Sequence, residues 1–301
     1  MYELIIVGAG PAGITASVYA ARKRINFLVI TENIGGQTAL SGDIENYTGY
    51  QFITGSDLTA KFEEHMKKYG VELKEGERVL EVCRKNDVVS VRTDKDNYEA
   101  RTAIIASGKK SRELGIAGEK EFRNKGVTYC ATCDGPLFAG KEVAVIGGGN
   151  AGLEAVIQLV KIAKRIYLIE ATPELTGDAI LEERIKQEEK VIILKNTKVL
   201  SIIGDKMVNG LQIRSEKGEE MLAVEGVFVE IGLMPNSEFA KDVEKNEHGE
   251  IKVDSCNKTS VKGIFAAGDV TDVPEKQIII AAGEGAKATL SAFKFLTKQK
   301  L

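Results

Sequence analysis

Short apolar runs that alternate with helix-like stretches organise the first part of the chain. Residues 4–7 and 27–30 are continuous apolar runs, a pattern typical of strands buried on both faces of a parallel sheet. Between them, the apolar positions of residues 14–23 recur at helical spacing. The pattern predicts an opening β-α-β unit, then a helix over about 56–69 and short antiparallel strands over 71–98.

The same succession of elements occurs a second time. Residues 143–146 and 166–169 are again apolar runs, with a helical pattern over 153–163 between them and antiparallel-looking strands afterwards. The chain has 301 residues, which is enough for two domains of ordinary size. The repeat therefore predicts an α/β fold with two Rossmann-like, three-layer dinucleotide-binding domains.

A glycine motif follows the first strand of each unit. In the first unit, Gly8, Gly10 and Gly13 stand between the strand and the helix with the spacing G-x-G-x-x-G. In a dinucleotide-binding turn, these glycines permit the tight turn, the approach of a pyrophosphate and close helix packing, respectively. The alternative is a plain glycine turn, but the flanking strands and helix favour a dinucleotide. The second motif has the same spacing at Gly147, Gly149 and Gly152.

An acidic residue closes the second strand of each unit. A carboxylate at this position can accept hydrogen bonds from a ribose hydroxyl, whereas it repels a 2′-phosphate. Glu170 has this place in the second unit, and residues 171–177 contain no Arg or Lys. We therefore expect NADH to be preferred over NADPH, against the alternative of an ordinary exposed glutamate. Glu32 has the corresponding place in the first unit, where a solvated loop residue is an equal alternative.

Three further segments have polar groups suited to an extended ligand. The last apolar run ends in Gly268-Asp269, which places Asp269 to hydrogen-bond a polyol such as a ribityl chain. A helical pattern over 277–296 follows, and its N-terminus can stabilise negative charge on a reduced flavin ring. Residues 35–37 and 45–49 combine polar side chains with glycines, although an exposed loop explains that composition equally well.

The sequence Cys130-Ala131-Thr132-Cys133-Asp134 carries the strongest candidate chemistry. Two thiols at this spacing can close a small disulfide ring and reopen it. A helix that begins there lowers a thiol pKa and so raises the reactive thiolate fraction. Asp134 adds a carboxylate that can move a proton. On spacing alone, the pair is also compatible with half a zinc site or with two buried cysteines.

A zinc site would require a second cysteine pair or a cluster of histidines. Cys83 and Cys256 stand alone, and His65 and His248 are far apart in the sequence. We therefore expect no metal site and interpret the C-x-x-C sequence as a redox pair.

Composition excludes several classes of protein. Lys and Arg total 41 against 44 Asp and Glu, for a net charge of −3 without a long basic run, so we expect no nucleic-acid partner. No apolar stretch approaches membrane-spanning length, and the first strand follows Met1 at once, so we expect neither a membrane segment nor a signal peptide. Four cysteines argue against a secreted disulfide scaffold, which favours the cytoplasm.

Together these motifs resemble those of low-molecular-weight thioredoxin reductases over essentially the whole chain. Residues 133–136 and 276–281 are closer still to the flavoprotein component of alkyl hydroperoxide reductase, which has an extra N-terminal redox domain that we expect this protein to lack. NADPH-dependent members of the family carry a His-Arg-Arg type motif after the second nucleotide strand. Here the positions read Ile169-Glu170-Ala171-Thr172, in agreement with the charge argument for NADH.

The resemblance implies a discontinuous FAD domain, residues 1–112 and 246–301, with a pyridine-nucleotide domain, residues 113–245, inserted in it. It also implies a homodimer in which the inserted domain rotates. Electrons would pass from NADH, or NADPH, through FAD and a Cys130–Cys133 disulfide to a thioredoxin- or glutaredoxin-like protein. Spacing leaves open which cysteine faces the flavin, and the resemblance favours Cys133.

The candidate site residues form three groups. The catalytic group is Cys130, Cys133 and Asp134. The group expected to bind FAD is Gly8, Gly10, Pro11, Ala12, Gly13, Glu32, Gly36, Gln37, Asn46, Gly108, Gly268, Asp269, Lys276, Gln277 and Ile278. The group expected to bind NAD(P)H is Gly147, Gly149, Asn150, Ala151, Gly152 and Glu170.

Three rival functions remain open. The first is a flavoprotein reductase of a peroxiredoxin system that works through a separate redox carrier. The second is a flavin reductase or NADH oxidase without a disulfide partner. The third is a redox-sensing protein that binds FAD and NAD without turnover.

Overall fold

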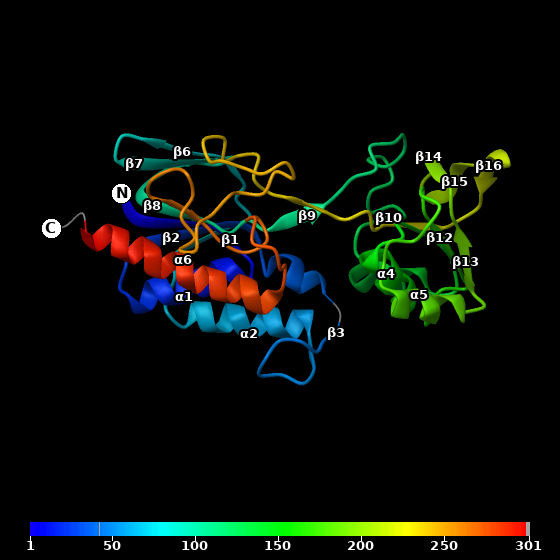
Figure 1. The fold of residues 1–301 in the computed structure, drawn as a ribbon, viewed down its shortest axis with the longest axis horizontal. Coiled ribbons are helices and arrows are strands. Elements are labelled where there is room, and N and C mark those ends of the chain that lie inside the picture. Colours follow the sequence, from blue (N-terminus) through cyan, green and yellow to red (C-terminus); the bar gives the residue numbers. More distant parts are fainter. Residues whose placement is uncertain (42, 299–301) are drawn as a thin grey trace. The chain divides into compact units, whose positions relative to one another are not determined.

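A computed structural model describes residues 1–41 and 43–298, except for the side chains of Asp43 and Cys133. The chain is α/β, with β-α-β units followed by runs of consecutive strands (Figure 1). Among the described residues, no helix has both the length and the apolar character that crossing a membrane requires.

The chain divides into two compact units. Unit 1 combines Met1–Lys110 with Met234–Leu301, and unit 2 is Ser111–Leu233. The resemblance implied a return to the first unit at residue 246, whereas residues 234–245 already group with unit 1. The reason is that Ala240 and Val243 are buried in an apolar cluster of unit 1.

The main sheet of unit 1 contains β1 (Tyr2–Ala9), β2 (Phe27–Ile34), β5 (Leu73–Glu75), β6 (Val79–Lys85), β7 (Val88–Thr93), β8 (Asn97–Ile105) and β19 (Ile264–Ala266). Strand β1 is central and pairs in parallel with β2 and β8, while β5 and β19 extend the parallel part. Strands β7 and β6 continue the sheet in antiparallel order from β8. The expectation of antiparallel strands over 71–98 is therefore confirmed except at β5, which is parallel to β2.

The helices of unit 1 are α1 (Pro11–Arg22), α2 (Gly55–Lys67) and α6 (Ile278–Lys298). They lie together on one side of the sheet, with α1 in contact with both others (Figure 1). Strand side chains alternate between the two faces, so Leu4 and Ile6 pack in the cluster that includes these helices. Ile5 and Val7 pack in a second cluster, with Ile251 from the returning chain. Both faces of β1 are therefore buried, as the apolar run predicts.

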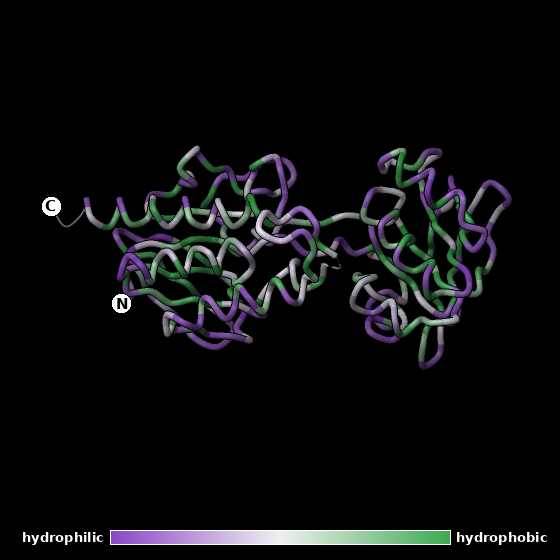
Figure 2. Tube along the Cα trace, turned by 90° about the horizontal axis from the view of Figure 1, so that it is seen from below, coloured by the Kyte–Doolittle hydropathy of each residue, from purple (hydrophilic) through white to green (hydrophobic). Residues whose placement is uncertain are grey.

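Unit 2 is built on a parallel sheet with the order β10 (Val127–Thr128), β17 (Gly226–Val229), β11 (Glu142–Ile146), β12 (Arg165–Ile169) and β13 (Val191–Leu194). Its helices are α3 (Ala131–Asp134), α4 (Asn150–Val160) and α5 (Ala179–Lys186). A separate antiparallel sheet contains β14 (Lys198–Gly204), β15 (Val208–Ser215) and β16 (Gly218–Leu222). In both units the hydrophobic residues follow the central strands, and the hydrophilic residues lie mainly in peripheral turns (Figure 2).

The two places where the chain passes between the units lie next to each other in the fold. Strands β9 (Lys109–Ser111) and β18 (Leu233–Pro235) pair as a two-stranded ribbon. At one end, the Arg112 N–H donates to the Gly232 carbonyl at 2.9 Å. At the other, the Asn236 N–H donates to the Gly108 carbonyl, also at 2.9 Å. The remaining short elements are β3 (Asp43–Ile44), β4 (Ile53–Thr54) and the 3₁₀ turns Gly36–Leu40 and Gly135–Phe138.

Candidate functional site

The first glycine motif forms the turn between β1 and α1. Gly8 has a φ of +100°, a conformation that side chains strongly disfavour, and a Cβ there would lie 2.4 Å from the Ala106 carbonyl oxygen. A Cβ on Gly13 would lie 1.9 Å from the Gly8 carbonyl oxygen. Pro11 is the first residue of α1, where its fixed φ suits a helix start. The turn therefore requires glycine at Gly8 and Gly13 whether or not a ligand is present.

Gly10 is different because its surroundings are open. A Cβ on Gly10 would meet nothing closer than the Gly35 carbonyl oxygen at 3.9 Å, and a Cβ on Gly36 would lie 3.5 Å from the Cα of Gly10. A side chain at either position would fill the space in front of the α1 N-terminus, where backbone N–H groups attract a phosphate. This cradle fits the pyrophosphate of FAD.

Several residues expected at the FAD site lie against one another in unit 1. The Asn46 amide donates to the Gln277 side-chain oxygen at 3.1 Å, across a separation of 231 residues. The Gln37 amide donates to the Lys109 carbonyl at 3.2 Å. A Cβ on Gly268 would lie 3.0 Å from the Ala12 side chain, so the Gly-Asp turn packs directly on α1.

Glu32 is not held in this way. Its side chain is 62% exposed, and its carboxylate lies 3.7 Å from the Nε of Arg78, which is equally exposed. Exposed pairs of this kind hold a side chain weakly. Gly108 directly precedes β9, and its carbonyl accepts the Asn236 N–H. Ile278 is the first residue of α6 and packs against the apolar cluster of Ile44, Ile53 and Leu58.

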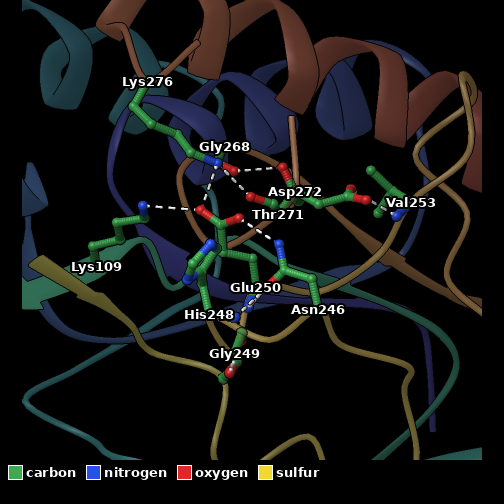
Figure 3. A network of polar contacts seen from close by, with 11 residues as sticks. Lys109, Asn246, His248, Gly249, Glu250, Val253, Gly268, Thr271, Asp272 and Lys276 are labelled. Carbon is green, nitrogen blue, oxygen red and sulfur yellow. Dashed lines mark hydrogen bonds and ion pairs between the residues drawn. The ribbon is translucent and has the colours of Figure 1, made fainter. Parts of the chain in front are cut away.

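A partly buried ion network that the sequence did not predict surrounds the start of α6 (Figure 3). Glu250 Oε1 lies 3.0 Å from the Nζ of Lys109 and 3.1 Å from the Nζ of Lys276. Its other oxygen accepts a hydrogen bond of 2.7 Å from Asn246. Lys276 also donates to the Thr271 carbonyl. One carboxylate thus positions Lys276, an expected FAD residue, against residues from the ribbon and the returning chain.

The pKa values of Glu250 and Asp269, the two acids of this region, are shifted in opposite directions. Burial opposes ionisation of Glu250, but hydrogen bonds from Asn246, Lys109 and Lys276 outweigh it and lower its pKa to about 2. Burial raises the pKa of Asp269, and the charges of Lys276 and Lys109 offset this only in part. Asp269 is therefore a half-buried carboxyl that gains from hydroxyl donors, which fits the ribityl chain of FAD.

The second glycine motif repeats the backbone of the first in unit 2. Gly147 has a φ of +118°, and a Cβ there would lie 2.3 Å from the Glu230 carbonyl oxygen. A Cβ on Gly152 would lie 1.9 Å from the Gly147 carbonyl oxygen. Gly149, at the N-terminus of α4, is again open, with only the Thr176 hydroxyl at 3.6 Å from a Cβ. The cradle fits the pyrophosphate of a nicotinamide dinucleotide.

Glu170 lies directly at this second turn. One carboxylate oxygen accepts the Gly148 N–H at 2.7 Å, and the other accepts the N–H and the hydroxyl of Thr172, both at 2.9 Å. Burial opposes its ionisation, but these hydrogen bonds outweigh burial and lower the pKa of Glu170. The carboxylate is therefore ionised and fixed in orientation, with lone pairs left for a ribose hydroxyl.

Two further contacts surround this turn. Asn150 donates to the Asp178 carboxylate at 3.1 Å and accepts the Asp178 N–H at 2.7 Å, so α4 is tied to the start of α5. Lys195, which local sequence did not connect with the site, lies 2.6 Å from the carboxylate of Glu174. Lys195 therefore places a positive charge beside residues 171–177, although that segment itself contains no Lys or Arg. Glu174 of the segment pairs with this charge.

The C-x-x-C sequence lies at the carboxyl end of β10. Cys130 is disulfide-bonded, whereas Cys83 and Cys256 are free thiols. Cys133 lies in the single turn α3, and the prediction that it pairs with Cys130 falls on a side chain outside the described part.

Asp134 ends α3 and is held by two contacts. The Asp134 N–H donates to the Cys130 carbonyl at 3.1 Å, and the Thr128 hydroxyl donates to the Asp134 carboxylate. The Thr128 hydroxyl also accepts the Cys130 N–H at 3.2 Å. Thr128 therefore links the candidate acid to the backbone of the disulfide, a contact that the sequence did not predict.

Known proteins resemble this chain over nearly its whole length. The sequence profile of the pyridine nucleotide-disulphide oxidoreductases matches residues 2–285. A crystal structure of thioredoxin reductase from Lactococcus lactis superimposes with a TM-score of 0.90, at 34% identity over 99% of this chain and 100% of that one. NADH dehydrogenase of Bacillus subtilis strain 168 is 42% identical over 301 residues, which are 99% of this chain and 59% of that protein.

An alkyl hydroperoxide reductase subunit of Staphylococcus aureus strain MRSA252 is likewise 42% identical over 301 residues, 99% of this chain and 59% of that protein. The chain therefore spans a little over half the length of these two relatives. The chain belongs to the family of pyridine nucleotide-disulphide oxidoreductases, whose cofactors are FAD and NAD(P)H, and has the fold of the low-molecular-weight thioredoxin reductases.

Proposed function

We propose that the protein is a disulfide reductase that passes electrons from NADH, through FAD and a Cys130–Cys133 disulfide, to a thioredoxin- or glutaredoxin-like protein. The observation that carries the proposal is the place of Cys130, which is disulfide-bonded next to α3 in the same unit as the second dinucleotide cradle. When bound, nicotinamide and flavin supply the two-electron chemistry that opening a disulfide requires.

The two cradles support an assignment of one cofactor to each unit. Unit 1 would hold FAD, with its pyrophosphate against Gly10 and Gly36 and its ribityl hydroxyls near Asp269. Unit 2 would hold the nicotinamide dinucleotide at Gly149, with Glu170 as the acceptor for a ribose hydroxyl.

The preference for NADH rests on charge. Glu170 is ionised and fixed by N–H donors, so a 2′-phosphate would meet a full negative charge there. Lys195, the cation beside the segment, is already paired with Glu174. NADPH would therefore gain no counter-ion and would be disfavoured.

The residues around the disulfide have separate roles in this proposal. Cys130 and Cys133 would exchange with a disulfide of the partner protein. Asp134, oriented by Thr128, would take a proton from one thiol and return it to the sulfur that leaves.

Anaerobic titration of the flavin-loaded protein tests the proposal. We expect the wild-type chain to take up about two equivalents of NADH, one for the flavin and one for the disulfide, since each is a two-electron couple. Cys130→Ser should take up about one equivalent and lose all reduction of a protein disulfide. Cys256→Ser removes an exposed free thiol and is the matched control, with the wild-type result expected.

The proposal fails if Cys130→Ser retains protein-disulfide reduction, or if the wild-type protein gains no free thiols from NADH. A parallel titration with NADPH tests the role of Glu170 in the preference for NADH. That role would be contradicted if, at low concentrations, the protein took up more NADPH than NADH.

The relatives favour a second candidate within the same enzyme class. The alkyl hydroperoxide reductase relative, at 42% identity, supports a function in which a separate redox carrier connects the chain to a peroxiredoxin. Comparison of purified thioredoxin with a glutaredoxin-like carrier as acceptor separates the two candidates. An NADH oxidase, the rival without a disulfide partner, predicts instead that Cys130→Ser leaves oxygen-dependent NADH consumption as the main activity.

A further inference from the structure

Glu230 follows the central strand β17, and its carboxyl contacts the residue after Cys130. Strand β10 pairs in parallel with β17, with Val127 opposite Val227 and Thr128 opposite Phe228. Extrapolated by two residues beyond the last pair, this register would bring residue 130 opposite residue 230 at the carboxyl end of the sheet. The hydrogen bond from the Ala131 N–H to the Glu230 carboxyl agrees with that placement. Sequence patterns gave no sign of it, because 99 residues separate Ala131 from Glu230.

The backbone fixes Glu230 from its other side. Its N–H donates to the Ile146 carbonyl at 2.8 Å. Its own carbonyl oxygen would lie only 2.3 Å from a Cβ placed on Gly147. The residue therefore bridges the last residue of β11, the second glycine turn and the first N–H of α3. Its side chain is only partly exposed, so its charge acts through a medium less screening than water.

We propose that Glu230 is a positioning residue for the Cys130 disulfide: held on the Ala131 N–H, its carboxyl sets how readily the reduced sulfurs ionise. This inference rests on the proposed function, because it takes the disulfide as the group that opens and closes. Opening breaks the S–S bond and consumes two electrons, and it yields one thiol and one thiolate with one proton, or two thiols with two protons. The thiolate and an ionised Glu230 repel each other, so the open site retains an additional proton.

The pKa of Glu230 lies in the pH range in which its charge can affect the ionisation of the thiols. Burial raises its pKa to about 7, with the Ala131 hydrogen bond opposing the rise and the charge of Glu154 adding to it. Glu154 acts from α4, and Asp134 lies at the far end of α3 with the Thr128 hydroxyl. Below this pKa the carboxyl is neutral and leaves the thiolate undisturbed. Above it, the carboxylate raises the thiol pKa.

The pH dependence of thiol alkylation tests the inference. The protein is the flavin-loaded chain with Cys83→Ser and Cys256→Ser, reduced by dithiothreitol, which ends as its cyclic disulfide. Relative to this background, Glu230→Gln should leave the rate with iodoacetamide unchanged near about pH 6 and raise it about three- to tenfold near about pH 8. Glu154→Gln removes only the charge beside Glu230. It should move the pH at which the alkylation rate responds to Glu230 to a lower value, without abolishing that response.

Glu225→Gln is the matched control, since Glu225 precedes the other end of β17, and it should give the profile of the background protein. The inference is wrong if Glu230→Gln gives that same profile, or if Glu225→Gln changes it equally. Should Glu230→Gln fail to fold, infrared difference spectra of the Asp134→Asn variant, reduced minus oxidised, decide instead. A protonated-carboxyl band must then grow on reduction near about pH 7, and its absence overturns the inference. Because dithiothreitol is the reductant, failure of NADH-driven turnover does not affect either readout.

Discussion

The two glycine turns of this chain have the same backbone and different surroundings. Gly13 and Gly152 each leave 1.9 Å between a Cβ and the carbonyl oxygen of the first glycine of their motif. The acids that follow differ: Glu32 is exposed beside Arg78, whereas Glu170 accepts hydrogen bonds from the turn itself. Glycine spacing thus determines the turn, but it does not determine whether the acid after the second strand belongs to the site.

The two units also hold their key acids by different means. Glu250 of unit 1 is paired with two lysines, and Glu170 of unit 2 is held by neutral donors. Pairing with cations makes the ionisation of an acid depend on its charged partners, whereas N–H donors keep it ionised without a counter-ion. This difference matters for the proposed preference for NADH, because a cation beside Glu170 would attract a 2′-phosphate.

The largest expected effect comes from Gly13→Ala compared with Gly152→Ala. Each places a methyl group on a carbonyl oxygen, which we expect to destabilise its own unit by about 3 kcal/mol or more. Gly13→Ala should purify without flavin, while Gly152→Ala should retain flavin and lose its reduction by NADH. Flavin content and thermal unfolding measure both. Gly149→Ala, whose methyl group would make only an ordinary contact with the Thr176 hydroxyl at 3.6 Å, should unfold like the wild type and lose dinucleotide affinity alone. Retention of flavin by Gly13→Ala would break the comparison.

Glu250→Gln tests the ion network of unit 1. The depressed pKa of Glu250 means that its contribution to stability is complete above its unfolded pKa near about 4.3 and is lost as pH falls through about 2. We expect the variant to lose about 2 kcal/mol of unfolding free energy at about pH 7, and the difference from wild type to shrink steadily below about pH 4. Urea unfolding across this range measures it, with exposed Glu32→Gln as a control that should match the wild type. A constant difference at all pH values would contradict the role of the charge.

Glu170→Ala and Glu32→Ala compare the two strand-end acids directly. Loss of Glu170 removes a ribose acceptor and unpairs the Gly148 N–H, so we expect NADH to bind about tenfold more weakly. Loss of Glu32 should change FAD retention by less than about twofold, because the side chain is exposed. Equilibrium dialysis and flavin release give the two values. Equal losses would show that both acids contact their cofactors.

The smallest expected effect is at Glu174. Glu174→Gln leaves Lys195 without its partner, so we expect NADPH to gain on NADH by about threefold in kcat/KM. The double variant Glu174→Gln/Lys195→Ala should restore the original ratio. A ratio that does not change in the single variant would place Lys195 outside the reach of a 2′-phosphate.

The sequence predicts those parts of the molecule that depend on neighbouring residues. The strands at 4–7 and 143–146 and both glycine turns follow from local spacing, and the structure confirms these elements. Helix α5 escaped prediction because only Ile185 of its residues is buried, which leaves almost no apolar stripe.

The remaining misses involve residues brought together from afar. Lys109 and Glu250 are 141 residues apart, and no periodicity relates them. No sequence pattern marks the unit to which residues 234–245 belong, since they bury only a few apolar side chains without a regular repeat. Sequence reasoning located the cradles, while the ion network around them required the fold.

The ribbon of β9 and β18 gives the inserted unit a simple boundary. The chain leaves unit 1 at Lys110 and re-enters it at Met234. One backbone hydrogen bond, from Arg112 to Gly232, lies on the side of unit 2, and another, from Asn236 to Gly108, lies on the side of unit 1. The intervening 111–233 is consequently a cassette: a short turn that joins the two strands should let the outer unit fold alone. Transplanting this cassette between homologues then requires that its two junctions, at Lys110–Ser111 and at Leu233–Met234, be matched.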